Sequence, residues 1–171
     1  MDKAIFLDRD GVINYDQGFV NKIEDFIFIP KVFESLKRFQ KEDYKLFIIT
    51  NQSGIGKGFY TLEQYQDVNN YMLSAFKRKD ITIEKVYFCL HHPDSNCDCR
   101  KPKTKFIKQA TKDFNLDISQ SWVIGDKLSD IKMGKRVECN TALINSRYVK
   151  DLKWIKKFKD LSEVCEYILR I

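Results

Sequence analysis

Two aspartates, Asp8 and Asp10, follow a short apolar run near the start of the chain and are followed at once by Gly11. Carboxylates this close repel each other unless they share a cation or one of them holds a proton. Both conditions occur in phosphoryl transfer through an aspartyl phosphate, in which one carboxylate is the nucleophile. The alternative is a simple turn, since Asp-Gly is a common turn dipeptide. The pair therefore indicates either a phosphoryl-transfer site or a loop without chemistry.

Three further segments place polar groups directly after apolar or structured stretches. Thr50 and Asn51, in ITNQS, offer a hydroxyl and an amide to a phosphate oxygen. Lys101, in CRKPK, stands just ahead of a helical pattern. Asp126 and Asp130, in VIGDKLSD, add two more carboxylates. Asp130 could orient Lys101 or a metal's water molecules, or it could equally cap the following helix or pair within it. These groups favour the phosphoryl-transfer interpretation over the turn.

Short apolar runs alternate with helical patterns along the chain. Continuous runs over residues 4–7, 45–49, 85–89, 122–124 and 142–144 are typical of strands buried on both faces. Apolar residues recur every three or four positions over residues 31–40, 62–77, 104–114 and 129–137, which predicts helices. This order predicts a doubly wound (Rossmann-like) parallel α/β sheet, in which ligands bind beyond the carboxyl ends of the strands.

Composition limits the class of protein. With 171 residues and 43% hydrophobic content, we expect one domain spanning residues 1–171. No run approaches the roughly 18 apolar residues of a membrane helix, so we expect a cytoplasmic protein without a membrane partner. We also expect a monomer. The net charge of +6 is spread along the chain without a recurring basic and aromatic platform, which favours a small anionic ligand over nucleic acid. The lysine-rich segment near the C-terminus is expected to be a solvated surface with Trp154 and Phe158 packed inward.

The segments FLDRDGVIN, ITNQS, CRKP and IGDKLSD resemble, in order, the four motifs of the haloacid dehalogenase-like phosphatases, over residues 5–130. The resemblance implies that Asp8 is the nucleophile and Asp10 the general acid and base. It implies that Thr50 and Lys101 stabilise the phosphoryl group. It also implies a Mg²⁺ ion held by Asp8, Asp126 and the backbone carbonyl of Asp10. Within the superfamily, the sequence is most similar to the D-glycero-D-manno-heptose 1,7-bisphosphate 7-phosphatases, with the histidinol phosphatases as near relatives.

The implied roles also have physical reasons. A carboxylate that attacks a phosphate must overcome the repulsion between two anions, and a bridging cation lowers that barrier. Asp10 would donate a proton to the leaving group and later accept one from water, so we expect its neighbours to raise its pKa. Lys101 and Thr50 offer a positive charge and a hydrogen-bond donor where charge spreads over the phosphoryl oxygens.

The segment CLHHPDSNCDC predicts a second metal site within a zinc-binding loop at residues 89–101. Clustered thiols in a cytosolic protein bind metal more often than they form disulfides. Cys89, His91, Cys97 and Cys99 form a Cys₃His set suited to tetrahedral Zn²⁺, with His92 as the competing ligand. The resemblance favours His91, because related loops carry C-x-H before a C-x-C pair. Four protein ligands leave no open position, so the site is expected to be structural.

Short loops must supply substrate specificity, because the residues between the first strand and the first helix are too few for a large cap domain. The segment NYDQGFV is similar to the N-x-D-x-G-[YF]-V pattern that lines the sugar site in the heptose phosphatases. Arg100 could pair with a second phosphate through its planar fork. The predicted substrate-binding residues are Asp16, Gln17, Gly18, Phe19, Asn51, Gln52, Ser53, Arg100 and Lys127.

The resemblance therefore predicts a Mg²⁺-dependent phosphatase that removes the 7-phosphate of heptose 1,7-bisphosphate. The short segment between His91 and Cys97, together with Lys105 after KPK, is more similar to the histidinol phosphatases. Histidinol phosphate or another small sugar phosphate is therefore the alternative substrate. An alternative of another class is a binding module that keeps the fold without catalysis, although all four motifs hold chemically competent residues.

Overall fold

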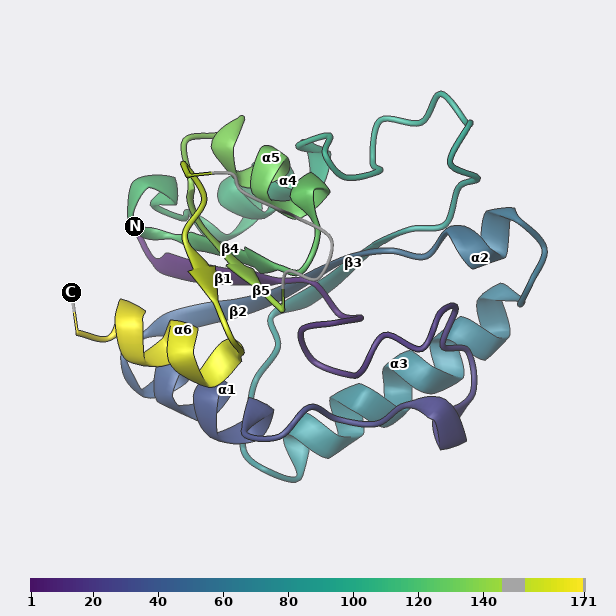
Figure 1. Ribbon diagram of the computed structural model, residues 1–171, viewed down its shortest axis with the longest axis horizontal. Helices are drawn as coiled ribbons and strands as arrows, with labels where there is room; N and C mark the ends of the chain where they lie inside the picture. The colour runs from purple at the N-terminus through teal and green to yellow at the C-terminus, as the bar shows by residue number, and fades with distance from the viewer. Residues whose placement is uncertain (146–152, 171) are drawn as a thin grey trace.

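Six parallel strands form the centre of the protein, in the order β3-β2-β1-β4-β5-β6 (Figure 1). The computed structural model describes residues 1–145 and 153–170. The strands are β1 (Lys3–Leu7), β2 (Tyr44–Asn51), β3 (Lys85–Cys89), β4 (Trp122–Gly125), β5 (Asn140–Ile144) and β6 (Lys157–Phe158). The predicted doubly wound parallel α/β fold is confirmed.

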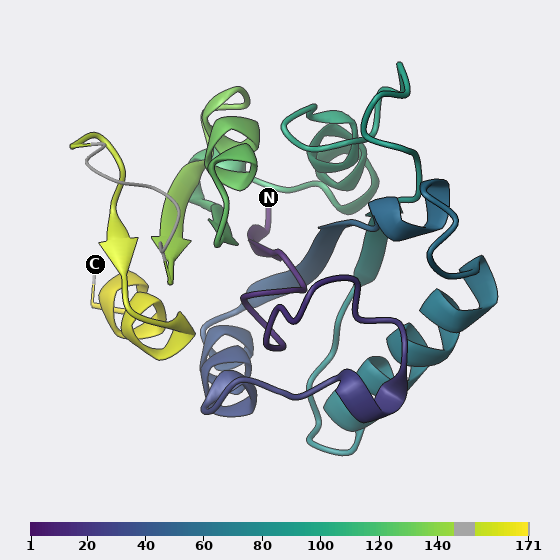
Figure 2. The ribbon, with the colours of Figure 1, turned by 45° about the vertical axis from the view of Figure 1, so that its right-hand side comes forward.

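Helices cover both faces of the sheet (Figure 2). One face carries α1 (Val32–Lys41), α3 (Leu62–Lys77) and α6 (Leu161–Ile168), and the other carries α4 (Lys105–Phe114) and α5 (Leu128–Lys135). The short helix α2 (Ser53–Gly56) follows β2, and two 3-10 turns, η1 (Ile23–Asp25) and η2 (Ile118–Gln120), lie in loops. A capping box between Thr61 and Gln64 fixes the start of α3.

Alternating side chains of the buried strands divide the core into two layers. In β1, Ile5 and Leu7 pack against α1, α3 and α6, whereas Phe6 packs on the opposite face with residues of α4 and α5. Phe6 also stacks on Phe47 of β2, with 5.3 Å between the ring centroids. Burial on both faces explains why these strands read as continuous apolar runs.

Three elements differ from the sequence-based expectations. Helices α2 and α6 and the two-residue strand β6 were outside the predicted set.

The expectation that Trp154 packs inward is wrong, because this residue is 54% exposed, whereas Phe158 does pack against the core. Residues 150–152 of the lysine-rich segment lie outside the described part of the chain. Among the described residues, no helix has the length and apolarity needed to span a membrane.

The chain order creates a switch point beside β1. From β1 the chain adds β2 and β3 on one side and then β4 and β5 on the other. Crossover connections therefore diverge at the carboxyl ends of β1 and β4, where open α/β sheets bind their ligands. Residues 8–31, which connect β1 to α1, contain only η1 as a regular element and form no large cap over this edge.

Candidate active site

Three carboxylates meet at the switch point. Asp8 directly follows β1, Asp126 directly follows β4, and Asp130 lies in the first turn of α5. All three residues are buried, and they offer carboxylate oxygens that lie within 4.8 Å of one another. The predicted placement of Asp8 and Asp126 at one edge of the sheet is thus observed, with Asp130 as the third member of the group.

Lys101 provides the positive charge for this group. Its ammonium lies 2.9 Å from Asp8 Oδ1 and 2.7 Å from Asp130 Oδ1, and it donates to the carbonyl of Ile49 at 2.8 Å. The backbone of Lys101 is held by Asn51, whose Oδ1 accepts from the Lys101 amide at 3.1 Å. The second oxygen of Asp130 accepts from the amide of Lys127 at 3.1 Å. Asp130 therefore both orients Lys101 and caps α5, the two roles that the sequence left open.

The electrostatics of the carboxylate group fit a divalent cation. Burial raises the pKa of Asp8 to about 6, with Lys101 opposing and Asp130 adding to the shift. Burial, followed by the charge of Asp8, raises the pKa of Asp126 to about 7. Asp126 Oδ1 is buried and accepts no hydrogen bond from the residues that the structure describes. The nearest cation to this oxygen is Lys127, with 3.7 Å between Nζ and Oδ1. A divalent cation held by Asp8 and Asp126 would offset the repulsion between the carboxylates and use the oxygen that accepts no hydrogen bond.

Asp10 has a different environment, which corrects one expectation. Its carboxylate accepts from Arg9 Nη2 at 2.9 Å, Arg9 Nε at 3.1 Å, Asn14 Nδ2 at 3.0 Å and Gln52 Nε2 at 3.0 Å. Burial favours the neutral acid, but the Arg9 charge and these hydrogen bonds together hold the pKa of Asp10 below its usual value. The expectation that its neighbours raise this pKa is wrong. Its side chain faces these donors, and the implied role of its backbone carbonyl as a metal ligand stays a prediction.

A cleft of about 320 Å³ opens above these groups. Eight of the nine predicted substrate-binding residues line it, namely Asp16, Gly18, Phe19, Asn51, Gln52, Ser53, Arg100 and Lys127. The ninth, Gln17, is exposed on the same loop and does not line the cleft. Lys127 and Asp16 face each other with 3.1 Å between Nζ and Oδ2. Arg100 Nη1 is buried and has no hydrogen-bond partner in the described part of the chain.

Three residues near the cleft were absent from the sequence-based set. Ser129 and Tyr60 line the cleft, and Tyr60 donates to Gln52 Oε1 at 2.6 Å. Arg9 is fully buried, with its guanidinium near the rings of Phe26 and Tyr65. The lone sequence signal for Arg9 was its position between the two aspartates, because a buried arginine requires a nearby carboxylate.

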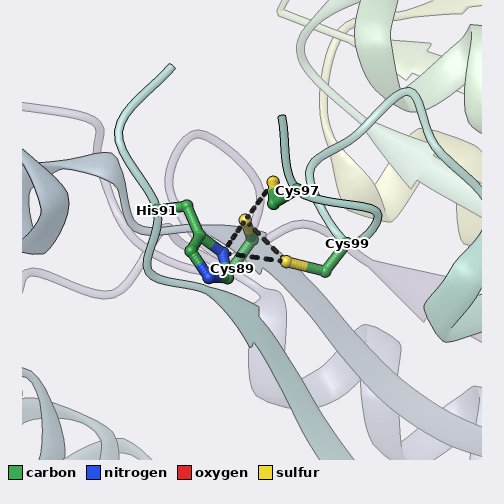
Figure 3. Close-up of side chains that lie close together, drawn as sticks. All are labelled: Cys89, His91, Cys97 and Cys99. Carbon is green, nitrogen blue, oxygen red and sulfur yellow. Dashed lines mark hydrogen bonds between the residues drawn. The ribbon is translucent and has the colours of Figure 1, made fainter. Parts of the chain in front are cut away.

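The second predicted metal site lies in the loop between β3 and α4, which extends away from the sheet (Figure 1). Cys89, His91, Cys97 and Cys99 direct their side chains toward one another (Figure 3). His91 Nδ1 lies 3.5 Å from Cys89 Sγ and 3.2 Å from Cys99 Sγ. His92 stays outside the cluster, where its Nδ1 accepts from the amide of Asp94 at 3.2 Å. Three thiols and one imidazole form a donor set that fits Zn²⁺.

Known proteins with similar sequences identify the family. A D-glycero-beta-D-manno-heptose-1,7-bisphosphate 7-phosphatase of Helicobacter pylori strain 26695 is 44% identical over 169 residues, covering 97% of each chain. The chain belongs to the heptose bisphosphate phosphatase family. A D-glycero-alpha-D-manno-heptose-1,7-bisphosphate 7-phosphatase of Campylobacter jejuni is 42% identical over 165 residues, with 96% of this chain and 95% of that protein covered. Residues 98–157 match the HAD-hydrolase-like family model, and the predicted membership of the haloacid dehalogenase-like superfamily is confirmed.

Solved structures of the heptose bisphosphate phosphatase family share this fold. The D,D-heptose 1,7-bisphosphate phosphatase of B. bronchiseptica, complexed with magnesium and phosphate, superimposes with a TM-score of 0.90 at 27% identity and covers 98% of both chains. The corresponding protein of Burkholderia thailandensis has a TM-score of 0.73 at 23% identity, with 99% of each chain covered, and supports the fold alone.

Proposed function

We propose that the protein is a Mg²⁺-dependent phosphatase that removes the 7-phosphate of D-glycero-D-manno-heptose 1,7-bisphosphate through a phosphorylated Asp8. One observation carries this proposal: Asp8, Lys101, Asp126 and Asp130 meet in a buried group beside a cleft that suits a phosphorylated sugar. The relatives named for this reaction, at more than 40% identity, support the same substrate.

In the first step, a carboxylate oxygen of Asp8 attacks the phosphorus atom, and the bond between phosphorus and the leaving oxygen breaks. Lys101 balances negative charge on Asp8 and on the phosphoryl oxygens, and Asp130 keeps the ammonium in place. Mg²⁺ held by Asp8 and Asp126 would neutralise part of the charge between nucleophile and phosphate. The buried hydroxyl of Thr50, at the end of β2, is a further donor for a phosphoryl oxygen.

Asp10 acts as the general acid in the first step and as the general base in the second. A bound phosphate is a like charge beside its carboxylate, and like charges favour the protonated form that the leaving oxygen requires. After the sugar leaves, the ionised Asp10 can accept a proton from the water that attacks the acyl phosphate. Arg9, Asn14 and Gln52 aim the carboxylate in both steps, since their hydrogen bonds fix its position.

The basic groups of the cleft support a substrate with two phosphates. Arg100 and Lys127 both line the cleft, outside the buried Asp8 group. Arg100 lines the cleft, and its guanidinium offers donors suited to the 1-phosphate. Lys105, one of the signals for histidinol phosphate, instead pairs with Asp98 at 2.9 Å and is not part of the cleft lining. The cleft therefore gives Lys105 no role that favours the alternative substrate.

We further propose that Zn²⁺ binds Cys89, His91, Cys97 and Cys99 and acts structurally. The loop has many polar residues and little to bury, so a metal would supply folding energy that side-chain packing cannot. Cys99 immediately precedes Arg100 and Lys101. A bound metal would therefore hold these two residues at the cleft.

All proposed catalytic residues come from one chain, so we propose that a monomer is sufficient for activity.

Steady-state phosphate release, measured with heptose 1,7-bisphosphate and with histidinol phosphate, tests the proposed function. We expect release that requires Mg²⁺, with the higher kcat/KM for the bisphosphate. A preference for histidinol phosphate would assign the alternative substrate. No release from either compound by the Mg²⁺-loaded protein would contradict phosphatase activity on both.

A further inference from the structure

A short chain of hydrogen bonds connects Tyr60 to two proposed catalytic groups. The Tyr60 hydroxyl lies 2.6 Å from Gln52 Oε1, and Gln52 Nε2 lies 3.0 Å from Asp10 Oδ2 and 2.8 Å from Thr50 Oγ1. Gln52 and Thr50 are buried, and Tyr60 is only 4% exposed. Such a network holds its members in fixed orientations because every polar atom has a defined partner.

The chemistry of the groups fixes the direction of these hydrogen bonds. An ionised carboxylate only accepts hydrogen bonds, so the NH₂ group of Gln52 must face Asp10. The amide oxygen then faces Tyr60, which must donate its proton. Burial raises the pKa of Tyr60 to about 12, so the hydroxyl stays protonated as this direction requires. Thr50 Oγ1 accepts from Gln52, which leaves its own hydrogen available to a phosphoryl oxygen.

The position of Tyr60 is set by the backbone beside it. A Cβ atom added at Gly54 would lie 2.0 Å from Cε1 of the Tyr60 ring, so the ring packs directly on this glycine. The hydroxyl is therefore held against Gln52 by packing of the ring. If the hydroxyl were absent, Gln52 Oε1 would lose its donor, and the amide would be held only through its nitrogen, by Asp10 and Thr50. The amide could then tilt away from its position between these two groups.

We propose that Tyr60 is a positioning residue that fixes the amide of Gln52 and, through it, the Asp10 carboxylate and the Thr50 hydroxyl. This inference rests on the proposed phosphatase function for its catalytic consequence. Tyr60 itself neither accepts the transferred proton nor contacts the phosphoryl group. Its hydroxyl acts by holding the oxygen of the Gln52 amide, while Asp10 and Thr50 hold the nitrogen.

The Tyr60→Phe variant tests this role, because it removes the hydroxyl and keeps the ring. We expect kcat to fall about 3- to 10-fold, the range that one net hydrogen bond is worth. KM should stay within twofold, because the hydroxyl that is removed donates to Gln52 and the ring that lines the cleft is kept. Tyr65→Phe is the matched control: Tyr65 is buried nearby, and its hydroxyl has no hydrogen-bond partner among the described residues. An unchanged kcat in Tyr60→Phe, or a loss confined to KM, would overturn the proposal.

A double variant separates action through Gln52 from a direct effect. Gln52→Ala should lower kcat at least as much as Tyr60→Phe, and adding Tyr60→Phe to Gln52→Ala should cause no further loss. Equal and additive losses would contradict the proposal, because they would show that Tyr60 acts without Gln52.

NMR spectroscopy tests the positioning role without relying on an activity assay. The side-chain amide protons of Gln52 should shift by NMR in Tyr60→Phe and stay unchanged in Tyr65→Phe. If the wild-type protein released no phosphate while the Gln52 signals shifted, the proposed function would fail and the hydrogen-bond chain would stand. Unchanged Gln52 signals in Tyr60→Phe would overturn the positioning role itself.

Discussion

Asp130 and Lys101 form a buried ion pair, with 2.7 Å between Asp130 Oδ1 and Lys101 Nζ and both side chains at most 2% exposed. The pair joins the first turn of α5 to the end of the Cys/His loop. Because Lys101 also contacts Asp8, the position of Asp130 controls the charge beside the proposed nucleophile. Asp130 and Asp8 therefore share one buried counter-charge, the Lys101 ammonium.

We expect Asp130→Asn to lower kcat by at least tenfold and the free energy of unfolding by about 1–3 kcal/mol, because the buried Lys101 ammonium loses one of its two carboxylate partners. The amide oxygen can still accept from Lys127, so the helix start should persist. Steady-state kinetics and denaturant unfolding measure the two effects. Asp67→Asn, on the exposed face of α3, is the control. Wild-type kcat in Asp130→Asn would refute the coupling to Lys101.

The Asp8→Asn variant should lose turnover completely, because an amide cannot form the acyl phosphate. The fold should persist, since the substitution keeps the size of the side chain and relieves repulsion with Asp126 and Asp130. Circular dichroism and phosphate release measure both properties. Activity near the wild-type level in this variant would remove Asp8 from the role of nucleophile.

Metal analysis of protein prepared without added zinc should find about one Zn²⁺ per chain, as a Cys₃His donor set binds one ion. Cys97→Ser should lower both the zinc content and the Tm, because the metal contributes folding energy. His92→Ala is the matched control, since His92 lies outside the cluster, and it should change neither value. Zinc loss in His92→Ala but not in His91→Ala would reverse the ligand assignment.

Removal of Arg100 should discriminate between substrates. A charge-assisted hydrogen bond is worth about 1.5–3 kcal/mol, so Arg100→Ala should lower kcat/KM for the bisphosphate about 10- to 150-fold. We expect the loss mainly in KM. A monophosphate should lose much less, since it lacks the second anion. Arg78→Ala, exposed after the end of α3 and away from the cleft, controls for net charge. Equal losses for both substrates would contradict the pairing of Arg100 with a second phosphate.

Much of the site could be predicted because parallel strands bring their carboxyl ends to one edge. Asp8, Thr50 and Asp126 each lie at or just after the end of a strand, so strand prediction alone placed them together. Local spacing likewise predicted a Cys/His cluster, in which the family resemblance favoured His91 over His92. Sequence patterns show where strands end and how closely ligand residues follow one another. These two properties determine where the strand-end residues and the Cys/His ligands lie.

Other features depend on contacts between distant side chains. Tyr60 could not be found from its spacing, because its role comes from packing on Gly54 and from a hydrogen bond to Gln52. The lowered pKa of Asp10 depends on where the neighbouring Arg9 side chain turns, which sequence order does not determine. Trp154 was expected inside because of its apolar ring, although one exposed aromatic residue is common on protein surfaces.

The product formed from heptose 1,7-bisphosphate in the presence of Mg²⁺ tests the central claim most directly. We expect ³¹P NMR to show loss of the 7-phosphate signal, with the 1-phosphate kept and inorganic phosphate released. The same mixture with Asp8→Asn should stay unchanged. Loss of the 1-phosphate, or an unchanged bisphosphate in the presence of the folded wild-type protein and Mg²⁺, would contradict the proposed function.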